Sequence, residues 1–346
     1  MTSLRLSNFE LLRVLAMLMV MALHADFSSL GLPTCDDLVS APLNVWTRLA
    51  VELAGIVAVD VFVLISGWFG IRASVRGLCR YLFTCLFFCI GVNVVMWTCG
   101  LPSLHDETLH MIRDKIEFNW FVIAYLLLYI LAPVLNTFVT TATRRTQRRV
   151  LLAFFAVQTL YGWLTNTAGY FYFGYSPLSF VGLYLLARYA AVFRPRWSRG
   201  KAKTYFALYA AFTAVQTIGG VVVLKITGMG VNIGGKAIDR LGAYNNPLVI
   251  ASSVALLLGF RELHFRSRLV NWLGASSFAV FLLHTHPALF GKFKQIVEYI
   301  YNIYSGWGFW LRLTAFLLLV YALAVLVDQI RIRLWRVVEK YVGSRR

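Results

Sequence analysis

The chain is divided into apolar stretches that are long enough to cross a lipid bilayer, and this pattern leaves few possible folds. A membrane-spanning helix needs about 20 predominantly apolar residues. Hydrophobic residues make up 59% of the 346 residues and charged residues only 14%, whereas a soluble domain carries about 25% charged residues. We therefore predict an all-α, polytopic integral membrane protein with about ten transmembrane helices, forming a single domain over residues 1–346. The expected spans are residues 9–29, 51–70, 81–100, 119–139, 150–167, 175–193, 204–224, 246–260, 270–290 and 308–330.

The distribution of charge predicts how these spans are oriented. Lys and Arg total 33 against 15 Asp and Glu, which gives a net charge of +18. Most of the basic residues fall in alternate connections and toward both ends of the chain. Cytoplasmic loops of membrane proteins carry such an excess, so both termini are expected in the cytoplasm. The same pattern argues against nucleic acid as a partner, because the basic residues form short clusters between apolar stretches rather than one face of a soluble fold.

The five cysteines predict neither a disulfide framework nor a metal site. They contain no Cys-x-x-Cys pair. Four of them lie in or beside one apolar stretch, where packing as small hydrophobic side chains is the simplest role. The five are Cys35, Cys79, Cys85, Cys89 and Cys99.

Ionisable residues inside the expected spans are the most informative candidates for function, because a charge in the hydrocarbon core is costly. Arg13 and His24 are eleven residues apart in the first span, which places them on one helical face with a rise of about 16 Å between them. Glu10 precedes Arg13 by one turn and is placed to pair with its guanidinium. A salt-bridged helix with a core histidine would give the same pattern, so spacing alone leaves a structural role open.

Four further ionisable residues lie inside the expected spans. Asp60 lies near the middle of the second span. It is placed either to accept the ring N–H of His24, as a carboxylate does for a general-base imidazole, or to link packed helices. His284 ends the ninth span at about the depth of His24, where a polar anchor is the simplest role. Arg312 and Asp328 lie toward opposite ends of the last span and are expected to be structural.

Two other groups have both a structural and a functional interpretation. Arg72, Arg76 and Arg80 recur every four residues after the second span and so share one helical face on the cytoplasmic side. Such a row is typical of cytoplasmic loops and is also suited to phosphates. Trp120 and Tyr125 open the fourth span, either as interfacial aromatic anchors or as rings that stack on a sugar.

Together these residues resemble the membrane acyltransferase family 3. The resemblance is carried by Arg13-x10-His24 in the first span and by Val59-Asp60-Val61-Phe62-x3-Ser66-Gly67 in the second. Other segments resemble the shorter members, which have no fused extracytoplasmic domain and occur in bacterial polysaccharide gene clusters as O-acetyltransferases. Those segments are Asn8-Phe9-Glu10-Leu11-Leu12-Arg13, Asn119-Trp120-Phe121, Tyr244-Asn245-Asn246-Pro247 and Phe278 to His284.

The resemblance implies transfer of an acyl group, usually acetyl, from cytosolic acyl-CoA to a sugar hydroxyl of a surface polysaccharide, an exopolysaccharide or its lipid-linked precursor. It implies a bacterial plasma (inner) membrane, acyl-CoA as a donor substrate, and no permanently bound cofactor. Counterparts of Arg13 and His24 are regarded as essential in that family. His24 would act as general base or, alternatively, carry an acetyl-histidine intermediate. The resulting expectation is a catalytic group of His24, Arg13 and Asp60, a donor-binding group of Arg13, Arg72, Arg76 and Arg80, and an acceptor-binding group of Trp120, Tyr125 and His284.

The chain departs from the longer relatives in two places. Ala124 and Tyr125 stand where those relatives have a glutamate, and Thr285 and His286 follow His284 where many have an acid. These departures bear on the acceptor more than on the reaction.

Two other classes of function remain as alternatives. A transporter or flippase for a lipid-linked sugar or a small anion would suit ten spans with intramembrane charges. However, the charged positions near Arg13 and Asp60 have no counterparts in the second half, as internal repeats would provide. A non-enzymatic membrane scaffold would leave the intramembrane charges without a purpose.

Overall fold

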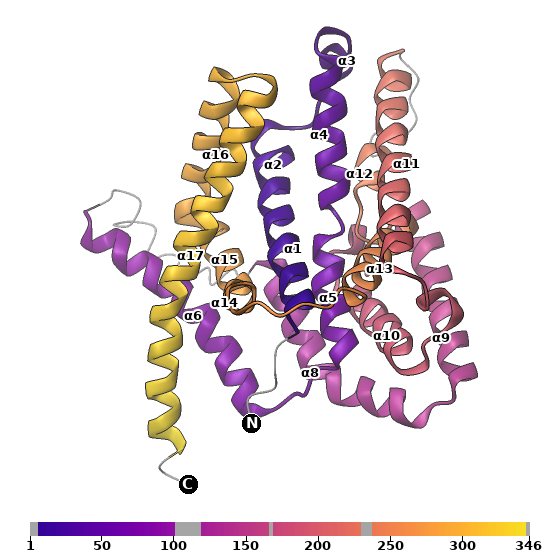
Figure 1. Ribbon diagram of the computed structural model, residues 1–346, viewed down its shortest axis with the longest axis vertical. Coiled ribbons are helices and arrows are strands. Elements are labelled where there is room, and N and C mark those ends of the chain that lie inside the picture. Colours follow the sequence, from indigo (N-terminus) through magenta and orange to yellow (C-terminus); the bar gives the residue numbers. More distant parts are fainter. Residues whose placement is uncertain (1–5, 101–118, 166–168, 230–236, 344–346) are drawn as a thin grey trace.

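In the computed structural model, which describes residues 6–100, 119–165, 169–229 and 237–343, every regular element is a helix (Figure 1). This confirms the all-α class. The elements are α1 (Ser7–Ala25), α2 (Phe27–Leu30), α3 (Cys35–Ser40), α4 (Pro42–Gly55), α5 (Ala58–Phe69), α6 (Val75–Thr98), α8 (Trp120–Thr141), α9 (Arg144–Val157), a π-helical segment (Gln158–Leu164), a 3₁₀ turn (Tyr172–Gly174), α10 (Pro177–Phe193), a second 3₁₀ turn (Arg196–Ser198), α11 (Ala202–Gly228), α12 (Ala237–Leu241), α13 (Pro247–Arg261), α14 (Arg268–Ala275), α15 (Ser277–His284), α16 (Pro287–Ile303) and α17 (Gly306–Gly343).

Several helical stretches are long and apolar enough to cross a membrane, so the protein is a multi-pass membrane protein. Six such stretches occur within the described ranges, and α10 and α13 are apolar but shorter. The expected number of about ten spans is therefore not confirmed by length and composition. The six are Ser7–Leu30, Pro42–Phe69, Val75–Thr98, Trp120–Thr141, Ala202–Gly228 and Gly306–Lys340.

The expected span at residues 270–290 is wrong as a single helix. α14 ends at Ala275, α15 ends at His284, and α16 begins at Pro287. The break has a local cause, because proline favours the first turn of a helix and the His286 side chain caps that turn by accepting a hydrogen bond from the Ala288 N–H at 3.2 Å. The expected span at 150–167 falls on α9 and the π-helical segment, and its last two residues lie outside the described part.

The two sides of the molecule differ in their basic residues. α1 begins and α17 ends toward the same side, drawn lower in Figure 1, where the α5–α6 and α8–α9 connections also lie. Arg72 lies in the first of these connections, and Arg144 and neighbouring arginines begin α9 just after the second, so we call this the basic side. α3, the end of α11 and α16 lie toward the other side, which we call the opposite side.

α1 and α5 form the centre of the helical assembly. α1 contacts α4, α5, α13, α14, α15, α16 and α17, while α5 packs on α1, α10 and α13. Neighbouring helices pack against several sides of both central helices. Leu12 and Met21 of α1 and Leu64 and Ile65 of α5 have no exposed surface. Residues that point between these helices therefore lie inside the protein, not in lipid.

The close approach of α5 and α10 depends on Gly67. A Cβ atom at this position would lie 2.6 Å from the Tyr184 carbonyl oxygen and 2.9 Å from the Ala187 Cβ. Both distances are shorter than van der Waals contact, and the first of these neighbours is backbone. The packing therefore leaves no room for a side chain at Gly67.

We predict that Gly67→Ala lowers the free energy of unfolding by about 1–3 kcal/mol, because α5 and α10 must move apart to accept the added methyl group. Thermal unfolding of the detergent-purified protein would measure the loss. The matched control is Gly91→Ala in α6, where an added Cβ has nothing within 4 Å. Equal melting of the two variants would contradict this account of the packing.

Candidate functional site

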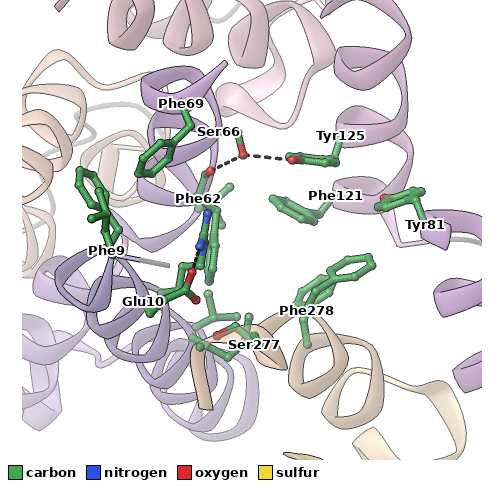
Figure 2. A pocket seen from close by; sticks show the side chains of 18 residues that line it. Phe9, Glu10, Phe62, Ser66, Phe69, Tyr81, Phe121, Tyr125, Ser277 and Phe278 are labelled. Carbon is green, nitrogen blue, oxygen red and sulfur yellow. Dashed lines mark hydrogen bonds and ion pairs between the residues drawn. The ribbon is translucent and has the colours of Figure 1, made fainter. Parts of the chain in front are cut away.

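A cavity of about 730 Å³ extends into the protein from the basic side. The exposed side chains of Leu6 and Phe69 lie at its mouth, and Val20 and Val59 lie at its inner end. Its walls come from α1, α5, α6, α8, α14 and α15 (Figure 2). Most of the lining is apolar, so the few polar side chains in it fix where a polar ligand group can sit.

Arg13 is the cationic side chain among the residues that line this cavity. Its guanidinium forms an ion pair with the Glu10 carboxylate, as expected from their spacing. The Glu10 side chain is 4% exposed and the Arg13 side chain 29% exposed, so the pair presents its positive member to the cavity. Gly274 of α14 lies against this pair, since a Cβ there would be 2.8 Å from the Glu10 carbonyl oxygen.

The cavity wall across from Arg13 contains five aromatic side chains in mutual contact. Neighbouring ring centroids lie between 5.3 and 6.5 Å apart, and the contacts close into a ring that joins α6, α8 and α15. The Tyr125 hydroxyl points to Ser66, with 3.0 Å between their oxygens, and the Ser66 hydroxyl donates to the Phe62 carbonyl (Figure 2). The five are Tyr81, Phe121, Tyr125, Phe278 and Phe281.

Beyond the inner end of the cavity, His24 and His284 form a hydrogen-bonded pair. The His24 Nδ1 and His284 Nε2 atoms are 2.9 Å apart, and the His284 Nδ1 lies 2.8 Å from the Val280 carbonyl oxygen. His24 is half-buried, whereas His284 is 3% exposed. The pair adjoins the cavity, because Val20 precedes His24 by about one helical turn and the Phe281 ring contacts the His284 ring.

The Val280 carbonyl determines which nitrogens of an uncharged pair carry protons. A carbonyl only accepts, so the His284 Nδ1–H donates to it and the His284 Nε2 is left as an acceptor. The His24 Nδ1–H then donates to that nitrogen. The remaining ring nitrogen of His24, Nε2, keeps its lone pair, and no described residue forms a hydrogen bond with it. His24 is thus prepared to accept a proton.

Asp60 forms no hydrogen bond with His24, contrary to the expectation that this carboxylate orients the imidazole. Asp60 has no exposed surface, and its Oδ2 lies 3.5 Å from the hydroxyl of Ser253 on α13. The position expected for Asp60 is taken by His284. The contact with Ser253 agrees with the alternative expectation, in which Asp60 links packed helices.

The arginine row is not part of the cavity wall. Arg76 and Arg80 lie 2.6 and 3.5 Å from the carboxylate of Glu339 on α17, while Arg72 is exposed. These contacts tie α6 to α17, a link that Asp328 and Arg331 reinforce from deeper in the protein. Within the described ranges, no group of three or more His, Cys, Asp or Glu side chains is placed to hold a metal ion.

Trp120 and Tyr125, which the sequence pairs as aromatic candidates, belong to different environments. Tyr125 lines the cavity, whereas Trp120 joins an aromatic cluster near the opposite side. Its ring lies 4.5 Å from that of Tyr175 and 5.8 Å from that of Tyr244. Phe121, the next residue, contacts Phe281, so this cluster and the histidine pair are joined through two aromatic rings.

Sequence reasoning missed two features of the site. The hydrogen bond between His24 and His284 joins residues 260 positions apart, for which the sequence gives no periodic signal. The second feature is the closed cluster of five aromatic side chains, whose members come from three helices. Phe278 and Phe281 could have been noticed because, at three residues apart on one helix, they share a face with His284.

The comparisons with known proteins give one match. The model of a family described as an acyltransferase domain matches residues 6–328, which includes the cavity and the histidine pair. No curated protein and no solved structure gives a match.

We predict that ¹⁵N NMR of the histidine-labelled protein at neutral pH will show His24 protonated at Nδ1 and not at Nε2. The same pattern is expected for His284, since the Val280 carbonyl fixes its tautomer. In His284→Ala the acceptor for the His24 Nδ1–H is lost, so His24 should become a mixture of both tautomers. A His24 that is protonated at Nε2 in the unchanged protein would contradict the assigned hydrogen-bond directions.

Proposed function

The chain belongs to this acyltransferase family, whose model covers most of its length, and on that premise we propose that it transfers an acyl group from cytosolic acyl-CoA to a sugar hydroxyl. Acetyl is the acyl group we favour. The acceptor would be a surface polysaccharide, an exopolysaccharide or its lipid-linked precursor, and the membrane the plasma membrane of a bacterium. The observation that carries the proposal is the His24–His284 pair just beyond the inner end of a cavity that opens on the basic side.

His24 would act as the general base. Its Nε2 takes the proton of the acceptor hydroxyl as the hydroxyl oxygen attacks the carbonyl carbon of the thioester. The carbon–sulfur bond breaks, the thiolate of CoA leaves, and the imidazolium returns the proton to that sulfur. His284 is a positioning residue in this step, because its Nε2 holds the His24 Nδ1–H and keeps the lone pair on the other nitrogen. In a two-step transfer the same nitrogen would carry the acetyl group.

The cavity is suited to the thioester arm of the donor. Its size fits a narrow chain, its few polar side chains can bind the amide groups of such a chain, and its mouth lies on the side that positive-inside topology assigns to the cytoplasm. Arg13 is half-buried in the wall and is fixed by Glu10, so it can bind a carbonyl or another polar group of the arm. The path from Arg13 to His24 runs along one face of α1.

The acceptor would approach from the opposite side, where Trp120, Tyr175 and Tyr244 form their cluster. Exposed aromatic faces are suited to stacking on sugar rings, and Tyr175 is 41% exposed. Since Phe121 and Phe281 connect this cluster to His284, a sugar held there would lie near the histidine pair. We therefore assign Trp120 to the acceptor and Tyr125 to the donor cavity.

We predict that His24→Ala lowers acyl transfer at least about 100-fold, the contribution typical of a general base. Isolated membranes containing the wild-type protein or the variant would receive radiolabelled acetyl-CoA, and alkali-labile label in the glycan would be measured. His264→Ala is the matched control, because His264 is exposed and outside the site. It should transfer label like the wild type.

Two results would count against this assignment in different ways. Equal labelling by wild type and His24→Ala would leave transfer in place but remove His24 as the base. Absence of labelling in all three membranes, with folded protein and a broad mixture of glycans, would instead favour the transporter or flippase.

A further inference from the structure

Arg188 has an unusual lack of partners for an arginine at a helix interface. It lies on α10 where that helix crosses the end of α5. Its Nη1 is 3.4 Å from the Trp68 carbonyl oxygen, which is long for an N–H···O hydrogen bond. Its Nε is buried without a hydrogen-bond partner, and no ion pair joins it to a described carboxylate. A guanidinium has five N–H donors, so this group has capacity for an anion.

The surrounding backbone is held in place by hydrogen bonds. The Tyr184 hydroxyl accepts from the Ile71 N–H at 3.0 Å and donates to the Asn136 side-chain oxygen at 2.7 Å. The Asn136 amide donates to the Ile71 carbonyl at 2.9 Å. Tyr129 bonds both the N–H and the carbonyl of Ser74. The connection between α5 and α6 is therefore preorganised, as a ligand-binding loop needs to be.

Gly70 provides the space in which the guanidinium sits. Its φ of +77° is a backbone conformation that favours glycine. A Cβ at this position would lie 3.2 Å from the Arg188 Nη1 and 3.3 Å from its Cζ. The guanidinium thus lies flat against a bare segment of backbone, with its position set by the same turn that ends α5.

This position is beside the mouth of the cavity. Arg188 contacts the backbone on both sides of Phe69, and Phe69 lines the mouth with Leu6 and Phe9. Of the other arginines nearby, Arg72 is exposed on the α5–α6 connection, and three others have acidic partners. Arg261, which lies over the Trp68 ring, is paired with Glu262, and the Arg76 and Arg80 side chains are paired with Glu339.

We propose that Arg188 binds a phosphate group of the acyl-CoA donor at the mouth of the cavity. This inference rests on the proposed function, because it takes the donor to be a thioester of CoA whose arm enters the cavity. Arginine is suited to the task, since its planar fork donates two parallel hydrogen bonds to a phosphate. In this proposal the phosphate is bound by Arg188 on α10 and not by Arg72, Arg76 and Arg80, which the sequence suggested as the donor-binding row.

The test compares a donor that carries the nucleotide and its phosphates with one that lacks them. Acetyl-CoA and S-acetylpantetheine would be used with the full-length wild-type protein, Arg188→Met and Arg188→Lys in phosphate-free detergent. Loss of hydrogen bonds to a charged phosphate should raise the KM for acetyl-CoA about 10- to 100-fold in Arg188→Met. The KM for S-acetylpantetheine and both kcat values should stay the same, and Arg188→Lys should be intermediate.

Arg196→Met is the control, because Arg196 is exposed on the connection that follows α10, and it should match the wild type with both donors. An equal rise of KM with both donors would overturn the proposal and make Arg188 a cap for the end of α5. The proposal would also be overturned if Arg188→Met kept the wild-type ratio of the two KM values and lost co-purified phospholipid. That result would assign Arg188 to a lipid headgroup.

Failure of the proposed function would look different, since the wild type would then transfer no acyl group from either donor. In that case calorimetry with CoA and with pantetheine, on purified wild type and Arg188→Met, decides the matter. Tighter binding of CoA that is lost in the variant supports the phosphate contact. Equal binding of both compounds to both proteins overturns it.

Discussion

The candidate site is organised by a chain of two hydrogen bonds, from His24 to His284 and from His284 to the Val280 carbonyl. Only the carbonyl in this chain has a fixed role, and it sets the direction of both bonds. Because the Val280 carbonyl belongs to the helix that carries His284, local geometry on α15 determines the tautomer of His284. The hydrogen bond between the two histidines then determines the tautomer of His24 on α1. A second histidine can thus leave the lone pair of the His24 Nε2 free. A carboxylate in its place would add a charge inside the membrane.

The rest of the fold positions this pair between two different environments. α1 carries both Arg13 in the wall of the cavity and His24 beyond its inner end. The five clustered aromatic side chains of α6, α8 and α15 form one wall of the cavity, and one of them, Phe281, also contacts the His284 ring. In the function proposed above, a donor from the basic side and an acceptor from the opposite side would meet at His24. Neighbouring helices pack on α1 and α5 and separate the cavity and the histidine pair from lipid.

Much of this could be predicted from residues that are close in sequence. The shared face of Arg13 and His24, and the pairing of Glu10 with Arg13, follow from helical geometry within one helix. The partner of His24 could not be predicted in this way, because both Asp60 and His284 lie at a suitable depth and only tertiary packing separates them. The arginine row shows the same difficulty. The expected helical face does not include Arg72, which precedes the first residue of α6, and the other two members contact Glu339 far along the chain.

The break in the expected span at 270–290 has a different cause. Apolar composition there is continuous enough for a spanning helix, but Pro287 and the His286 cap begin a new helix. That break leaves His284 at the end of a short helix. Hydropathy does not detect such an interruption, because it measures the average over a window and not the identity of the residues that end a helix.

The most direct test of the central claim is the sidedness of transfer in sealed, inverted membrane vesicles that contain the protein. Radiolabelled acetyl-CoA would be added to the cytoplasmic face, which is the outer face of such vesicles. The account predicts glycan esters inside the vesicles, protected from an added esterase until detergent opens the membrane. Label on glycan that the esterase removes without detergent would contradict the claim that donor and acceptor reach His24 from opposite sides.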